Sequence, residues 1–106
     1  MDIVKVTTDS FKTEVLDSKQ VVLADFWAVW CMPCRMMEPV VEKLAQAYDG
    51  KLRVAKINVD EENELAGQYN IQSIPSFLVF HKGQLVNQVI GAVPQRTLEQ
   101  LIKDYV

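Results

Sequence analysis

Apolar and polar positions recur along the chain with two periods, which predict alternating strands and helices. Continuous or alternating apolar runs predict strands at residues 3–6, 21–27, 52–59, 77–81 and 84–90. Helical spacing of apolar residues predicts helices at about 9–18, 34–48, 61–69 and 98–105. The run at 21–27 is apolar except for Asp25, a pattern typical of a strand that is covered on both faces in a parallel sheet.

The order of these elements is β-α-β-α-β-α-β-β-α. Strands that alternate with helices predict parallel crossover connections, whereas the last two strands, separated by Lys82-Gly83, predict an antiparallel hairpin. The expected fold class is therefore α/β, with a central mixed sheet and helices on both faces. No repeat, linker or low-complexity segment interrupts the pattern, so residues 1–106 are expected to form one domain.

Three local features refine the predicted helices. Thr8 or Asp9 can cap the first one. Pro39 lies inside the second and is expected to kink it, because proline lacks the backbone donor. The acidic run at 60–64 precedes the third, where negative charge favours a helix N-terminus, so a structural role is expected for it.

Charge and composition exclude several classes of function. The net charge of −3 and the scattered Lys and Arg residues argue against nucleic acid as the main partner. No apolar run approaches the roughly 20 residues of a membrane span, and the first ten residues lack the pattern of a secretion signal. The expectation is a monomeric protein of the cytoplasm, with no membrane association.

The only two cysteines, Cys31 and Cys34, are the main candidates for chemistry. A structural staple would close a very small loop and contribute only about 2 kcal/mol. A zinc site would need four ligands, and the second ligand pair is missing, so no metal is expected. The remaining interpretation is a redox pair.

The position of the pair predicts a division of labour between the two thiols. Cys31 follows a buried strand and precedes a helix, where unpaired amides favour the thiolate that attacks a disulfide. Cys34 lies one turn further in and is expected to be more covered, which suits a resolving thiol. Pro33 falls in the first helical turn, where a missing N–H costs little.

The sequence DFWAVWCMPC at 25–34 resembles the active-site segment of the thioredoxin family. The similarity covers essentially the whole chain and implies the thioredoxin fold and protein disulfide reductase activity. Further matching positions follow in the same order: Lys56, Asn58, Asp60, Ile74-Pro75, Lys82-Gly83 and Gly91-Ala92.

Two interpretations of Asp25 remain. It can form a buried structural pair with Lys56, because a buried carboxylate needs a partner. Alternatively, its desolvated carboxyl accepts the proton of Cys34 as that thiol attacks, an arrangement that the resemblance also implies. We interpret Asp25 as the general base, with Lys56 beside it.

The resemblance also implies a groove that holds the substrate segment. Pro75 is cis in the family and lies against the cysteine pair, although only about one X-Pro bond in twenty is cis in general. Residues expected to contact substrate are Trp30, Met32, Pro33, Ile74, Pro75, Gly91 and Ala92.

Met32 departs from the family pattern, which most often has glycine between the cysteines. Methionine adds adaptable apolar surface beside the nucleophile. With Val29 and Trp30, it predicts a more hydrophobic docking face than is usual in the family.

The predicted partners are disulfide-containing client proteins and a thioredoxin reductase that uses flavin and NADPH. No bound cofactor is implied, because the cysteines carry the electrons. The alternatives are a disulfide oxidase or isomerase, against which the absence of a histidine between the cysteines argues, and a docking module without redox turnover.

Overall fold

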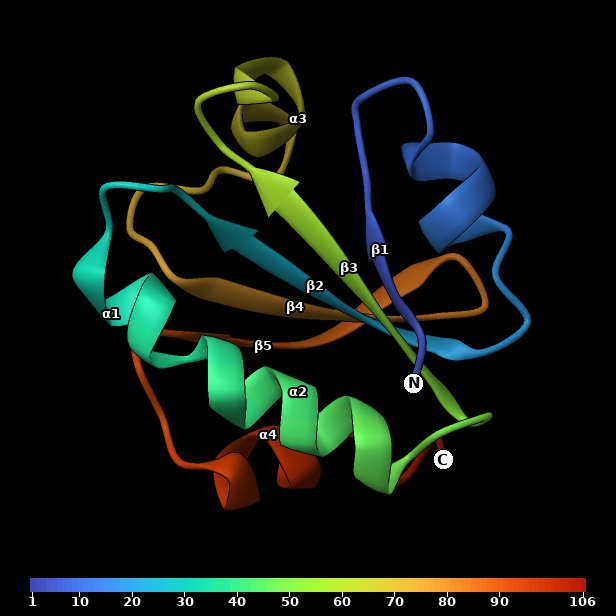
Figure 1. Cartoon of the computed structure of the whole chain (residues 1–106). Coiled ribbons are helices and arrows are strands. Elements are labelled where there is room, and N and C mark those ends of the chain that lie inside the picture. The colour runs from blue at the N-terminus through green and yellow to red at the C-terminus, as the bar shows by residue number, and fades with distance from the viewer.

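The computed structural model describes residues 1–106 and contains one five-stranded sheet with helices on both faces (Figure 1). The strands are β1 (Ile3–Lys5), β2 (Val21–Trp27), β3 (Leu52–Asn58), β4 (Ser76–His81) and β5 (Gln84–Ile90). The helices are η1 (Lys12–Leu16), α1 (Met32–Met36), α2 (Glu38–Ala47), α3 (Asn63–Gln68) and α4 (Gln95–Ile102). The predicted order of strands and helices is confirmed except between β2 and β3, where two helices replace the single predicted one. None of the helices is long and apolar enough to cross a membrane.

The strand order in the sheet is β1-β3-β2-β4-β5. The first three are parallel, while β4 is antiparallel to both β2 and β5. The mixed sheet expected from the sequence is therefore confirmed. The connection from β3 through α3 to β4 is not the parallel crossover that alternating strands and helices predict, because β4 runs antiparallel to β2. The β4–β5 turn places Lys82 and Gly83 at φ angles of 53° and 79°, as a two-residue hairpin turn with positive φ at both positions requires.

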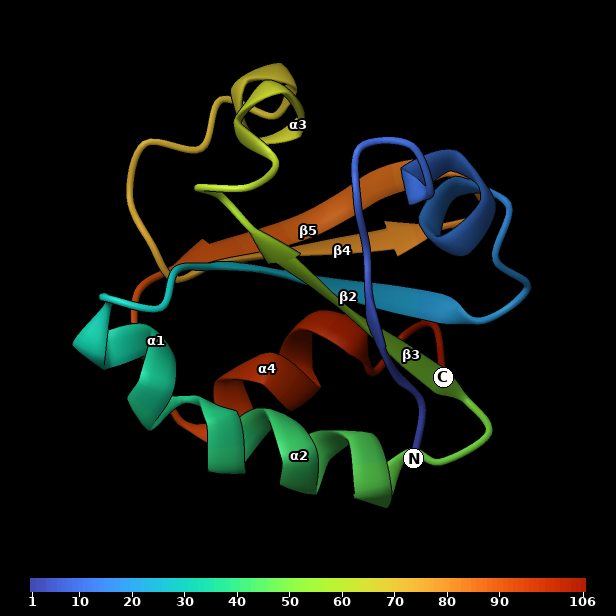
Figure 2. The ribbon, with the colours of Figure 1, turned by 45° about the horizontal axis from the view of Figure 1, so that its top comes forward.

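Alternation along β2 divides the core into two layers. Val22, Ala24 and Phe26 point toward the layer formed with η1 and α3, whereas Val21 and Leu23 point toward α2 and α4. Figure 2 shows the two pairs of helices on opposite sides of the sheet. Asp25 shares the second face by its odd position in the strand, and it is almost fully buried there.

The long helix predicted at 34–48 is two helices rather than one kinked helix. The first ends at Met36 and the second begins at Glu38, with Pro39 in its first turn. Because Pro39 has no N–H to donate to Arg35, four residues earlier, the hydrogen-bond ladder is interrupted there. Met37 joins the two helices, and its buried side chain packs into the core.

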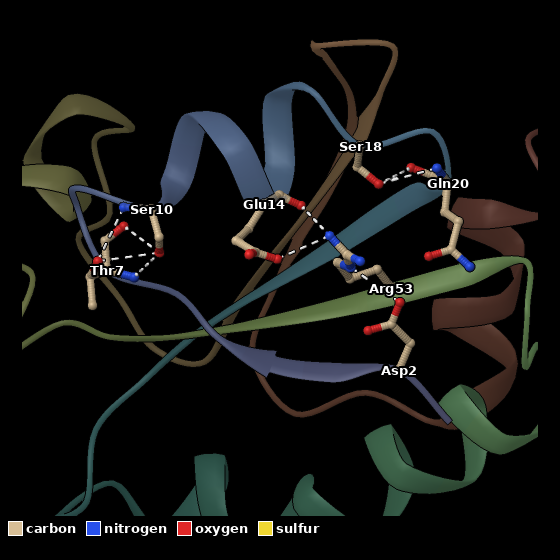
Figure 3. Close-up of polar contacts among 7 residues, drawn as sticks. All are labelled: Asp2, Thr7, Ser10, Glu14, Ser18, Gln20 and Arg53. Atoms are coloured by element: carbon tan, nitrogen blue, oxygen red, sulfur yellow. Dashed lines mark hydrogen bonds and ion pairs between the residues drawn. The ribbon is translucent and has the colours of Figure 1, made fainter.

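The N-terminal helix also differs from the prediction. Its regular part is a single π-helical turn closed by the Asp17 amide on the Lys12 carbonyl. The preceding turn is held by Thr7 and Ser10, each of which donates its amide to the hydroxyl of the other, at 2.9 and 3.1 Å (Figure 3). Thr8 instead donates to Glu62, so the predicted cap at Thr8 or Asp9 is wrong.

Arg53 of β3 bonds to η1 and to the residue that precedes β1, on the η1 side of the molecule. Its guanidinium donates to Asp2 at 3.1 Å, to the Glu14 carboxylate at 3.0 Å and to the Glu14 carbonyl at 3.2 Å (Figure 3). The Arg53 side chain is only 26% exposed, so these charge-assisted bonds are partly shielded from water.

Replacing Arg53 by glutamine is expected to lower the free energy of unfolding by about 1–2 kcal/mol, because the fork of donors is lost and two carboxylates lose their partner. Urea denaturation measures this loss. The control is Lys12→Gln, which breaks the exposed Lys12–Asp17 pair and should cost at most about 0.5 kcal/mol. Equal losses in the two variants would contradict the importance of the Arg53 contacts.

Candidate active site

The register of the sheet brings three chain segments to one end of the molecule. Phe26 near the end of β2 pairs with Ser76 at the start of β4, and Ser76 pairs with Ile90 at the end of β5. The loop after β2, the segment before β4 and the turn after β5 therefore meet. Both ribbon views show α1 beside the segment that precedes β4 (Figures 1 and 2).

Cys31 and Cys34 form a disulfide at this end of the sheet. Cys31 has extended backbone angles and is the N-cap of α1, and its sulfur accepts a hydrogen bond of 3.2 Å from the Cys34 amide. Pro33 lies in the first helical turn, where its missing N–H removes no helical bond. The amide that would otherwise be unpaired at the helix start thus points at the Cys31 sulfur.

The two cysteines are equally buried. Each residue is 4% exposed, so the expectation that Cys34 would be more covered is wrong. The reason is that both cysteines form one buried cluster with Ala28, against which Trp27, Val59 and Ile74 pack. The asymmetry between the thiols therefore lies in the hydrogen bond to Cys31 rather than in burial.

The Ile74–Pro75 peptide bond is cis, as the family resemblance implied. The Ile74 carbonyl oxygen lies 3.8 Å from the Cys31 sulfur, and the Pro75 carbonyl accepts a 2.8 Å hydrogen bond from the Gly91 amide. Gly91 has a φ of 99°, which disfavours any other residue, and no heavy atom lies within 4 Å of where a Cβ would be. Ala92 follows it and is exposed.

Four apolar side chains beside the disulfide are largely exposed. Val29, Trp30, Met32 and Met36 are 61%, 70%, 63% and 66% exposed. The Trp30 indole is nevertheless fixed, because its Nε1 donates a 2.9 Å hydrogen bond to the Asp60 carboxylate. The sequence placed Asp60 in an acidic run before a helix and among the positions that match the family, but it gave no sign of the contact with Trp30, so this role was missed.

Asp25 is 3% exposed, and its Oδ1 has no hydrogen-bond partner. Burial raises the pKa of this carboxyl from 3.8 to about 7, Lys56 opposes the rise, and Glu38 adds to it. A carboxyl that titrates near neutral pH can both accept and return a proton under physiological conditions. Asp25 lies on the sheet face covered by α2. This helix directly follows α1, which carries Cys34.

Lys56 is the neighbour of Asp25 across the β2–β3 pair, but it does not form an ion pair with it. Its ammonium lies 3.9 Å from the Glu38 carboxylate and 4.6 Å from the centre of the Trp27 ring. The interpretation of Asp25 and Lys56 as a direct structural pair is therefore wrong for this disulfide form. Glu38 was not foreseen as a member of the site.

Comparison with known proteins identifies the family. The family model described as Thioredoxin matches residues 2–104. The chain belongs to the thioredoxin family. It is 52% identical to thioredoxin 1 of Nostoc sp. over 95% of this chain and 94% of that one, and 50% identical to a Synechocystis thioredoxin over the same shares. A thioredoxin of Porphyra purpurea is 46% identical over 100% of this chain and 99% of its own length.

Family membership and the disulfide at the helix start together show the activity. The chain is a protein disulfide reductase that carries its redox centre in its own cysteines, and its partners are a thioredoxin reductase and disulfide-containing substrates. No group of three or more His, Cys, Asp or Glu side chains is arranged to hold a metal ion.

The buried carboxyl predicts how stability depends on pH. The pKa of Asp25 is higher in the folded chain, so the folded state binds this proton more tightly, and stability falls as pH rises from about 4 to about 7. A shift from 3.8 to about 7 corresponds to about 4 kcal/mol. Asp25→Asn should therefore stabilise the disulfide form by several kcal/mol at pH 8 and by much less at pH 4.

Denaturation of both proteins at several pH values measures this difference. The control is Asp9→Asn, which changes an exposed carboxylate far from the site. Its free energy of unfolding should differ from that of the wild type by the same amount at every pH. A gain from Asp25→Asn that is the same at pH 4 and pH 8 would show that the carboxyl does not titrate between them.

Proposed function

We propose that Cys31 attacks the disulfide of a client protein and that Cys34 resolves the resulting mixed disulfide. The observation that carries the assignment is the hydrogen bond from the Cys34 amide to the Cys31 sulfur at the N-cap of α1. A thiolate on Cys31 keeps this donor and faces the positive end of the helix dipole. Cys34 has no comparable donor, so it begins as a thiol.

Asp25 is the general base for the second step in this proposal. The Cys34 thiol loses its proton to the Asp25 carboxylate, and the new thiolate attacks the Cys31 sulfur of the mixed disulfide. The Cys31–client bond breaks, the Cys31–Cys34 bond forms, and the client leaves as a thiolate that is then protonated. The raised pKa of Asp25 and its unpartnered oxygen support this role.

The client segment docks along the surface around the disulfide. On one side lie the exposed side chains of Trp30, Met32 and Pro33. On the other side, the half-buried Ile74 places its carbonyl next to the Cys31 sulfur, and the buried cis-Pro75 follows it in the chain. Gly91, which donates its amide to the Pro75 carbonyl, and the exposed Ala92 adjoin this surface, and the missing Cβ of Gly91 lets a partner backbone approach closely.

Met32 makes this docking surface adaptable. Together with Val29, Trp30 and Met36, it forms an exposed apolar surface next to a redox pair that is itself buried. Unbranched methionine side chains can repack against differently shaped partners. The proposal is therefore a reductase with a broad range of protein clients rather than one fitted to a single ligand.

In the proposed cycle, a second protein restores the reduced form of the chain. A flavin-dependent thioredoxin reductase that uses NADPH returns the disulfide to the dithiol. The match over residues 2–104 supports a single domain over 1–106, which works as a monomer. The cytoplasm suits this activity, because a reducing compartment keeps the working dithiol reduced.

Trapping of clients tests the assignment of the two thiols. Wild-type protein with excess dithiothreitol should accelerate the reduction of insulin disulfides, whereas Cys31→Ser and Cys34→Ser should both lose this turnover. In the absence of dithiothreitol, Cys34→Ser should accumulate a mixed disulfide with the client, because the resolving thiol is missing. Cys31→Ser should accumulate little, because the attacking thiol is missing. Non-reducing gels and mass spectrometry measure the adducts.

Equal trapping by both variants, or stronger trapping by Cys31→Ser, would overturn the assigned roles. Absence of insulin reduction by the wild type would overturn the reductase activity itself.

A further inference from the structure

Lys56 lies between two carboxylates and contacts only one of them. Its ammonium is 3.9 Å from the Glu38 Oε1 atom and lies over the Trp27 ring, 4.6 Å from the ring centre. Asp25, its neighbour across the strand pair, has an Oδ1 atom with no hydrogen-bond partner. Lys56, the lysine beside the buried Asp25, therefore pairs with Glu38 instead of with Asp25.

The break between the two helices is what places Glu38. The ladder is interrupted at Met37, so α2 starts afresh at Glu38, directly above the sheet face that carries Asp25, Trp27 and Lys56. Lys56 has a side chain only 22% exposed, whereas Glu38 is 46% exposed and lies at the rim of the site. The lysine therefore reaches outward along the Trp27 ring to meet the glutamate.

Two charged groups that act on Asp25 come from different elements. They are Lys56 from β3 and Glu38 from α2, with opposite effects on the carboxyl. The other elements on this face contribute the cysteine pair from α1 and apolar side chains, among them Phe77 from β4 and Leu98 from α4.

We propose that Glu38 is a positioning residue for the resolving step: by pairing with Lys56 it keeps the ammonium on Trp27 and away from Asp25, which leaves the buried carboxyl able to take the Cys34 proton. This inference rests on the proposed role of Asp25 as the base.

Removal of the glutamate charge changes the site in two ways that act in the same direction. The negative charge of Glu38 no longer disfavours ionisation of Asp25, and Lys56 is released to approach the Asp25 carboxylate. Both effects stabilise the ionised form of Asp25. The carboxylate is then a weaker base, and it is ionised at lower pH.

The experiment compares Glu38→Gln with the wild type in the full chain. Carbon-13 NMR of the Asp25 carboxyl in the disulfide form reads its proton affinity directly. We expect a decrease of about two- to fivefold, the size of a partly exposed charge interaction. The rate of mixed-disulfide resolution should fall on acidification at a lower pH than in the wild type, by the amount that corresponds to this change in proton affinity. The matched control is Glu42→Gln, an exposed glutamate further along α2, which should change neither reading.

A double variant tests whether the effect passes through the lysine. In Lys56→Gln, the added change Glu38→Gln should have a smaller effect on the proton affinity of Asp25 than in the wild type, because only the direct repulsion between Glu38 and Asp25 is then lost. An unchanged Asp25 titration in Glu38→Gln, or an effect of the same size with and without Lys56, would overturn the positioning role.

The failure of the underlying mechanism gives a different result. If Asp25→Asn resolves mixed disulfides at the wild-type rate across neutral pH, Asp25 is not the base, and the functional part of the proposal is overturned. The NMR titration still decides separately whether Glu38 controls the carboxyl through Lys56.

Discussion

The hydrogen bond from the Cys34 amide to the Cys31 sulfur is the interaction on which the chemistry of this molecule depends. It gives an otherwise symmetric pair of buried sulfurs a direction, because only Cys31 occupies the N-cap of α1. The rest of the fold serves to hold that helix start in place. The pairing of β2, β4 and β5 brings the loop before Cys31 beside Pro75 and Gly91, so the attacking sulfur lies against the Ile74 carbonyl.

Asp25, the base proposed for the resolving step, lowers the stability of the folded chain when it is ionised. A carboxyl buried on the α2 face without a partner destabilises the folded chain above the pH at which it ionises. A direct ion pair with Lys56 would reduce that cost, yet it would also make the carboxylate a weaker base. Because Lys56 pairs with Glu38 and Trp27 instead, the ionised Asp25 carboxylate continues to destabilise the folded chain. The proposed role of Asp25 as the base accounts for an unpartnered acid in a core strand.

Local patterns predicted the framework well, because strands and helices leave a clear period in the sequence. The bounds of β2 and β5 agree with the predicted 21–27 and 84–90, and the hairpin turn follows directly from Lys82-Gly83. The cysteine pair, Asp25 and the cis bond before Pro75 came from a motif and a family resemblance. Within helices the predictions were weaker: Pro39 separates two helices rather than bending one.

The errors share a physical cause, since each depends on contacts between residues distant in sequence or on a choice among equivalent local partners. Trp30 meets Asp60 thirty residues later, and Glu38 meets Lys56 only because β3 returns beneath α2. Thr7, Thr8 and Asp9 are all suitable caps, and the contact of Thr8 with Glu62 decides among them. The equal burial of Cys31 and Cys34 likewise depends on the packing of Ala28 and Ile74.

The most direct test of the central claim is the relative reactivity of the two thiols in the reduced protein. Brief treatment with limiting iodoacetamide near pH 7, followed by mass spectrometry of the cysteine peptides, measures which sulfur is the better nucleophile. The N-cap hydrogen bond predicts that Cys31 is alkylated first and that Cys34 remains largely unmodified. Because the two residues are equally buried, accessibility alone predicts similar rates. Comparable alkylation of both sulfurs, or faster alkylation of Cys34, would contradict the account.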